Sequence, residues 1–162
     1  MQQTLVLAKP DAVQRGLIGD IIGRFERKGL KVVGLRLLAV PREMAEEHYA
    51  VHAGKHFYDG LVEFITSGPV AAFALEGPDA IAVVRKMVGK TMPNEAEPGT
   101  IRGDLGVSGL RNLIHASDAP ETAEAELARQ LQPARNPFGL IPSVPEQPNL
   151  PFRVHAASPS CP

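Results

Sequence analysis

The chain has 162 residues, 44% of them apolar and 22% charged, which is the composition of one ordinary globular domain. Its formal net charge of −1 gives no general attraction to nucleic acid, so any cationic site has to be local. The single cysteine, Cys161, excludes an intrachain disulfide and a cysteine-based metal site. We therefore expect one core and no nucleic-acid partner.

The N-terminal segment predicts neither export nor membrane insertion. It reads MQQTLVLAKPD, without a basic stretch and with only a short apolar run before Lys9. No apolar run approaches the roughly 18 residues of a membrane-spanning helix. We expect a cytoplasmic protein without a membrane partner.

The first half of the chain predicts strand, helix, strand and two more helices. Residues 4–8 form a short apolar run before Pro10, and apolar residues at helical spacing then extend from Val13 to Phe25, ahead of Gly29. Residues 30–40 are rich in Leu and β-branched side chains, which favour a second strand. Short helices are expected at 42–51 and 57–65.

The second half completes an α+β pattern. Residues 69–77 predict a strand, 78–89 a helix, 99–111 a glycine-rich loop and 112–116 a brief strand. A last helix begins with a capping box, Asp118 as the N-cap and Glu121 three residues on. Without the extra helices the order is βαββαβ, a ferredoxin-like sandwich with a four-stranded antiparallel sheet and helices on one face.

The composition changes after residue 131. Eight of the fifteen prolines lie within 132–162, where no apolar period survives. We interpret 1–131 as the folded domain and 132–162 as a Pro-rich tail that is disordered or loosely packed. The fold is expected to survive deletion of the chain from Pro133 onward.

The glycine-rich loop carries the side chains of a phosphate site. Arginines offer planar donor forks, and glycines allow the backbone to approach a ligand closely. The sequence has no G-x-x-x-x-G-K-[ST] motif, so the phosphate site is not a P-loop. Taken singly, each cation is more often an ordinary solvated surface residue. The loop supplies Arg102 and Arg111, and the candidates outside it are Lys9, Arg85, Thr91 and Asn112.

His115 is the candidate nucleophile. A lone histidine is more often structural than catalytic, but this one lies between a short strand and the start of a helix, where an anion is favoured. A neutral imidazole beside a bound phosphate is a competent nucleophile. His48, His52 and His56 recur every four residues, but Gly54 interrupts the helix that would stack them, so no metal site is predicted there.

Five segments together resemble the nucleoside diphosphate kinase family over residues 3–131. They read LAKPDAVQRGLIGDIIGRFERKG, HYAVH, EFITSGPV, GKTMPNEAEPGTIRGD and RNLIHASD, in that order. The resemblance implies transfer of the γ-phosphate of a nucleoside triphosphate, typically ATP, to a nucleoside diphosphate through phosphorylated His115. It also implies Mg²⁺ carried on the nucleotide phosphates, no metal held by the protein, and a homo-oligomer, either a tetramer or a hexamer.

The resemblance also implies a role for each matching residue. Glu126 would orient the imidazole of His115, with Tyr49 and Ser117 in support, while Phe57 and Leu61 would clamp the base. Because stacking alone distinguishes bases poorly, low base selectivity is expected. Contacts to sugar and phosphate would come from Lys9, Arg85, Thr91, Arg102 and Asn112.

Two departures from the family pattern leave alternatives open. Gly109 stands where the family usually has a larger apolar residue, so contact with the base is expected to be weaker. The residues after Leu127 also differ from the usual ending of the family. A nucleotide-binding regulatory protein, or a scaffold with an impaired kinase site, is therefore the rival hypothesis.

Overall fold

The computed structural model describes residues 1–107, 109 and 111–131. The prediction for the tail therefore lies outside the described residues. No helix in the described part is both long enough and apolar enough to cross a membrane. The strands are β1 (Gln2–Ala8), β2 (Lys31–Ala39), β3 (Pro69–Gly77) and β4 (Ile114–Ala116). The helices are α1 (Pro10–Gln14), α2 (Ile18–Arg27), α3 (Arg42–His48), α4 (Tyr58–Thr66), α5 (Ala80–Val88), α6 (Ile101–Leu105) and α7 (Pro120–Leu131), with 3₁₀ turns at Ala50–His52 and Pro93–Glu95.

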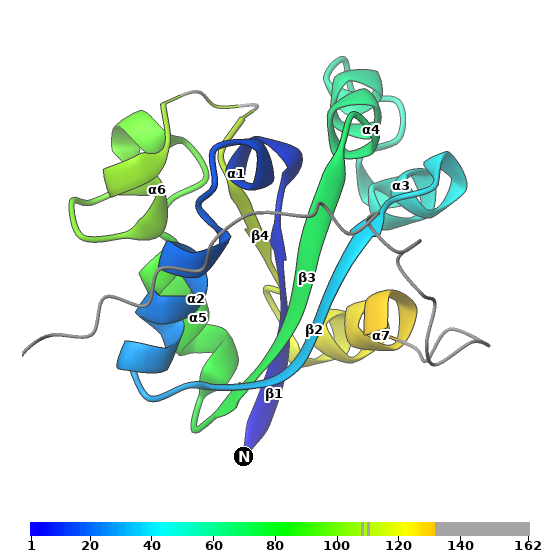
Figure 1. Ribbon diagram of the computed structural model, residues 1–162. Helices are drawn as coiled ribbons and strands as arrows, with labels where there is room; N and C mark the ends of the chain where they lie inside the picture. The colour runs from blue at the N-terminus through cyan, green and yellow to red at the C-terminus, as the bar shows by residue number, and fades with distance from the viewer. Residues whose placement is uncertain (108, 110, 132–162) are drawn as a thin grey trace, which may run out of the picture. The chain divides into compact units, whose positions relative to one another are not determined.

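The strands form one antiparallel sheet in the order β2-β3-β1-β4 (Figure 1). This is the order of the predicted ferredoxin-like βαββαβ sandwich, so that prediction is confirmed. β1 pairs along its whole length with residues 71–77 of β3, and β4 pairs with the C-terminal end of β1. The chain passes from β2 to β3 through α3 and α4 rather than through a tight hairpin. His115, in β4, thus lies at one edge of the sheet, opposite Leu7.

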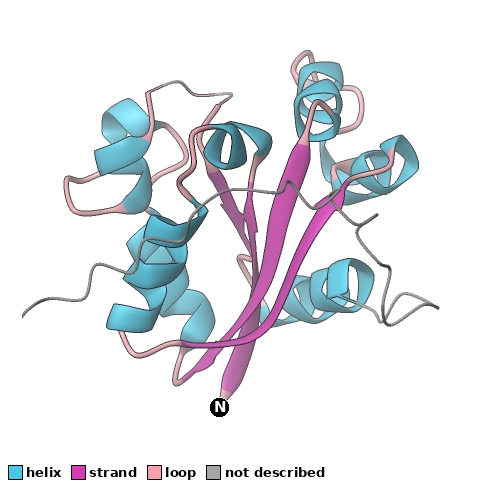
Figure 2. Cartoon of the chain, in the orientation of Figure 1, coloured by secondary structure: helices cyan, strands magenta, loops and turns pink. Residues whose placement is uncertain are grey.

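Helices cover both faces of the sheet, which corrects the expectation that they lie on one face (Figure 2). Side chains alternate along a strand, so Val6 and Ala8 face one way and Leu5 and Leu7 the other. Val6 and Ala8 pack in the main core with Phe25 of α2 and residues of α5. Leu5 and Leu7 belong to a second cluster, against which Leu127 of α7 packs. α7 therefore approaches the sheet from the face opposite α2 and α5.

Glycines explain two helices that the sequence did not predict correctly. The single helix expected from Val13 to Phe25 is in fact α1 and α2, separated by Gly16 at φ 68°. α6 lies inside the predicted loop, and its N-cap Thr100 accepts a hydrogen bond from the backbone N–H of Gly103 at 3.0 Å. Gly103 also passes so close to the carbonyl of Glu97 that a Cβ would clash with it. Its helix propensity is low, but its lack of a side chain is required there.

The last helix begins at Pro120, so the predicted capping box is wrong. Asp118 is not the N-cap. Its carboxylate accepts a hydrogen bond from the hydroxyl of Thr122 at 2.7 Å, and that hydroxyl in turn accepts from the backbone N–H of Ala119 at 3.0 Å. Pro120 suits the first helical position because it lacks an N–H.

Candidate active site

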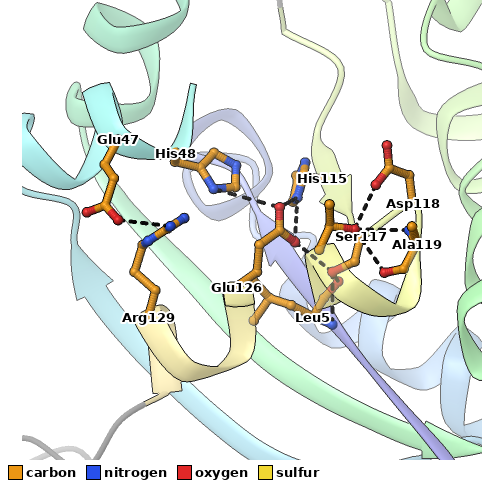
Figure 3. Close-up of polar contacts among 10 residues, drawn as sticks. Leu5, Glu47, His48, His115, Ser117, Asp118, Ala119, Glu126 and Arg129 are labelled. Carbon is orange, nitrogen blue, oxygen red and sulfur yellow. Dashed lines mark hydrogen bonds and ion pairs between the residues drawn. The ribbon is translucent and has the colours of Figure 1, made fainter. Parts of the chain in front are cut away.

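His115, Ser117 and Glu126 form one hydrogen-bonded group between β4 and α7 (Figure 3). Nε2 of His115 lies 3.0 Å and 3.1 Å from the two carboxylate oxygens of Glu126. The hydroxyl of Ser117 donates to Glu126 at 2.6 Å, and the backbone N–H of Leu5 donates to that hydroxyl at 3.3 Å. These contacts fix both the carboxylate and the ring, and no hydrogen bond from any described residue engages Nδ1 of His115.

His48 is a further member of this group, and the sequence did not identify it. It is the last residue of α3, and its ring meets that of His115 edge-on at 4.7 Å between centroids. Its Nδ1 lies 3.9 Å from Glu126 and has no hydrogen-bond partner, although it is buried. Burial, together with the nearby His115, lowers the pKa of His48 to about 4, so the ring is neutral at neutral pH.

Hydrogen bonds favour the ionised form of the Glu126 carboxyl group. Burial acts to raise the pKa of this carboxyl group, but the hydrogen bond from His115 and the charge of that ring outweigh burial and hold the pKa below its usual range. Tyr49 is buried beside His48, with ring centroids 4.8 Å apart, and burial raises the pKa of its phenol to about 12. The group therefore presents one ionised carboxylate to one imidazole.

Three of the predicted phosphate-site residues form a chain of hydrogen bonds. Nζ of Lys9 donates to the side-chain oxygen of Asn112 at 2.7 Å, and the amide nitrogen of Asn112 donates to the carbonyl of Thr91 at 3.0 Å. Lys9 is 6% exposed. Burial, and secondarily the charge of Arg102, lowers the pKa of Lys9 to about 8.

Arg102 is also buried, and hydrogen bonds to backbone carbonyl groups fix the orientation of its side chain. Its guanidinium donates to the carbonyls of Gly89, Asn112 and Ile114. A guanidinium has five N–H groups, so two remain for another acceptor. Burial, followed by the charge of Arg85, lowers its pKa to about 10, which leaves it cationic at neutral pH. Arg102 thus joins α6, β4 and the end of α5 around a cationic centre.

An unusual backbone conformation lies just before His115. Leu113 adopts φ 70° although it is not glycine, which costs about 1–3 kcal/mol. Its N–H donates to the carboxylate of Asp11 at 3.1 Å, and its carbonyl accepts from the N–H of Lys9 at 2.8 Å. Asp11 is buried. The start of α1 therefore sets the backbone that places Asn112 and His115.

We expect Asp11→Ala to lower the free energy of unfolding by about 1–3 kcal/mol, because it leaves the buried N–H of Leu113 without a partner. Chemical denaturation measures this effect. Glu63→Ala, which removes an exposed carboxylate of α4, is the control. Equal stability of the two variants would contradict this role of Asp11.

The other predicted residues make contacts of their own. Arg111 lines a separate cavity together with Asp11 and Phe64. Phe57 precedes α4 and contacts the rings of His52 and His56, while Leu61 packs on the cluster of α3 and α4. Gly109 faces Met92, whose side-chain end would meet an added Cβ. His48, His52 and His56 do not share one helix, since α3 ends at His48 and Gly54 has φ 81°.

Comparison with known proteins identifies the family. The family model described as nucleoside diphosphate kinase matches residues 2–135. The chain is 59% identical to a nucleoside diphosphate kinase of Synechococcus elongatus over 83% of this chain and 90% of that protein. It is 58% identical to one of Archaeoglobus fulgidus over 79% of this chain and 85% of that protein.

Solved structures agree with this assignment. A nucleoside diphosphate kinase of Halobacterium salinarum in complex with CDP superposes with a TM-score of 0.78 at 53% identity, covering 80% of this chain and 86% of that one. An apo nucleoside diphosphate kinase of Encephalitozoon cuniculi gives a TM-score of 0.80 at 43% identity, covering 81% and 89%. The chain therefore belongs to the nucleoside diphosphate kinase family and has the phosphotransferase activity for which that family is named.

Proposed function

We propose that the kinase works by a ping-pong mechanism in which Nδ1 of His115 carries the phosphate. This proposal rests on the hydrogen bond between Nε2 of His115 and the carboxylate of Glu126. That bond holds the proton on Nε2 and leaves the lone pair on Nδ1. The side chain of His115 is 25% exposed, so a nucleotide can reach it.

The phosphate is transferred in two steps. The lone pair of Nδ1 attacks the γ-phosphorus of the triphosphate, the bond from that phosphorus to the bridging oxygen breaks, and the diphosphate leaves with the electron pair. The positive charge that forms on the imidazole is offset by Glu126, which accepts from Nε2–H. A second diphosphate then attacks the phosphohistidine through its terminal oxygen and restores the neutral ring.

The phosphates of the substrate would be bound by the buried cations. Lys9 and Arg102 lie close enough for the charge of Arg102 to lower the pKa of Lys9, and Arg85 acts on Arg102 in the same way. A bound anion would offset the repulsion between these cations. Phosphoryl transfer depends on such positioning and charge neutralisation. Mg²⁺ belongs to the substrate here, as the Mg²⁺ complex of the nucleotide.

We expect nucleotide binding to take up protons above pH 8. Lys9 has a pKa of about 8 in the free protein, and a bound polyphosphate raises it because it favours the charged form. At pH 8.5 the uncharged fraction of Lys9 must therefore gain a proton when ADP binds, and affinity should fall as the pH rises further. Calorimetry in buffers with different ionisation enthalpies measures this uptake.

Lys9→Met tests the assignment of that proton. The variant should bind ADP more weakly and without proton uptake at pH 8.5, whereas Lys28→Met, which removes an exposed lysine after α2, should behave as the original protein. Uptake that persists in Lys9→Met would assign the proton to another group.

Low base selectivity is part of the proposal. Phe57 and Leu61 offer apolar surface, and no polar side chain among the predicted base contacts must pair with one base edge. The Halobacterium salinarum enzyme was solved with CDP. We infer that nucleoside diphosphates of several bases are acceptors for this chain.

The experiment that separates this mechanism from a regulatory or scaffold role is label transfer. The protein is incubated with Mg²⁺ and γ-labelled ATP, separated from nucleotide, and then mixed with unlabelled GDP. The proposal expects labelled protein first and labelled GTP afterwards. A protein that binds ATP but never becomes labelled would instead support the regulatory or scaffold alternative with an impaired site.

We also infer a homo-oligomer in the cytoplasm, of four or six subunits. β2 is an edge strand, and Val33, Leu35 and Leu37 on it are 41%, 59% and 61% exposed. An apolar edge strand of this kind favours pairing with another chain. Leu35→Glu combined with Leu37→Glu is expected to reduce the molar mass measured by light scattering. An unchanged mass would place the subunit contact elsewhere.

A further inference from the structure

Three metal-ligating side chains converge at the catalytic histidine. His48, His115 and Glu126 each offer one ligand atom, and these three atoms all lie within 4.8 Å of one another (Figure 3). They come from α3, β4 and α7, so each is fixed by a different element. The same oxygen, Oε1 of Glu126, is 3.0 Å from Nε2 of His115 and 3.9 Å from Nδ1 of His48.

This geometry suits a tetrahedral cation. Zinc bonds to histidine nitrogen and carboxylate oxygen at about 2.0–2.2 Å, which places tetrahedral ligand atoms about 3.4 Å apart. The observed separations of 3.0 Å and 3.9 Å bracket that value. Two imidazoles and one carboxylate are a known ligand set for zinc, whereas Mg²⁺ prefers oxygen ligands alone.

His48 provides a second and independent observation. Its side chain is only 5% exposed, and Nδ1 has no hydrogen-bond partner. An unpartnered buried nitrogen is costly, and it points toward the oxygen that His115 already uses. Ser117 binds the other oxygen of Glu126, which leaves Oε1 for a shared ligand. A cation between Oε1 and Nδ1 would satisfy the free nitrogen.

We propose that His48, His115 and Glu126 form an inhibitory Zn²⁺ site that switches the nucleophile off. Zinc binds the lone pair of Nε2 of His115, so the proton of that nitrogen moves to Nδ1 by exchange with solvent. Nδ1–H has no lone pair with which to attack phosphorus. This inhibitory consequence rests on the proposed use of Nδ1, whereas the binding of zinc does not.

The test measures zinc affinity of the full-length, untagged protein without nucleotide, by competition with a chromophoric chelator. We expect one Zn²⁺ per chain and, for His48→Gln, an affinity lower by about 100-fold or more, since even changes to residues behind a ligand cost 10–100-fold. His56→Gln removes an exposed histidine as the matched control and should keep the affinity. Equal affinity of the original protein and His48→Gln would overturn the site.

Nitrogen NMR of His115 gives a readout that does not depend on a variant folding. The metal-free protein should have its proton on Nε2, and the zinc-loaded protein should have it on Nδ1, with reversal by chelator. Stoichiometric zinc should also prevent labelling by γ-labelled ATP. Ring resonances of His115 that do not respond to bound zinc would overturn the proposal. Zinc affinity is measured without nucleotide, so the zinc site can fail its test while ATP still labels the protein. Labelling can equally fail while zinc still binds. The two proposals are therefore tested separately.

Discussion

Replacing His115 by alanine is expected to abolish both labelling of the protein and turnover, a loss of at least about 10⁴-fold. Alanine offers no atom that can carry the phosphate, and Glu126 is then left without the ring to which it is hydrogen-bonded. Labelling with γ-labelled ATP and the ADP-to-ATP exchange rate measure the two effects. Both should fall together, because each needs the same nitrogen.

The control replaces a histidine outside the segment that the family model matches. His155 lies beyond the residues that the family model matches, and His155→Ala should be labelled like the original protein. The label itself should be stable in base and labile in acid, as a phosphoramidate is and a phosphoserine is not. Turnover that persists in His115→Ala, or intersecting rather than parallel lines in double-reciprocal plots, would exclude the ping-pong mechanism.

The second largest effect is expected from Glu126→Gln, which should lower kcat by about ten- to a thousandfold and change KM little. Glutamine keeps the shape: its oxygen can accept from Nε2–H of His115 and its amide can face Ser117. What it loses is the charge that stabilises the cationic ring formed during transfer. Stopped-flow rates of phosphorylation measure this loss directly.

Glu124→Gln is the matched control, since it removes an exposed carboxylate from the same helix. It should retain the full rate. Equal rates for Glu126→Gln and the original protein would mean that the carboxylate only packs against the ring. A rise in KM with unchanged kcat would instead assign Glu126 to binding of the nucleotide.

The sequence predicted the sheet well because its signals are local. The apolar runs before Pro10 and over 69–77 became β1 and β3, and the spacing from His115 to Glu126 placed one on a strand and the other on the next helix. α6 was missed because glycine at Gly103 argues against a helix by propensity alone. Only the close carbonyl of Glu97 shows why glycine is needed there.

Tertiary contacts account for what the sequence did not show. His48 meets His115 across 67 positions of the chain, whereas its four-residue spacing to His52 suggested only a helical stack, which Gly54 argued against. The left-handed backbone conformation of Leu113 has no signature in the sequence. It is held by hydrogen bonds to Asp11 of α1 and to Lys9, the residue before α1. Neither could be found from periodicity.

The nitrogen that carries the phosphate decides the central claim most directly. The protein is phosphorylated with the Mg²⁺ complex of ATP, kept at alkaline pH, digested and examined by mass spectrometry for the residue and by phosphorus–proton NMR for the ring position. The bond between Glu126 and Nε2 predicts one phosphate, on Nδ1 of His115. Phosphate on Nε2, or on any residue other than His115, would contradict it.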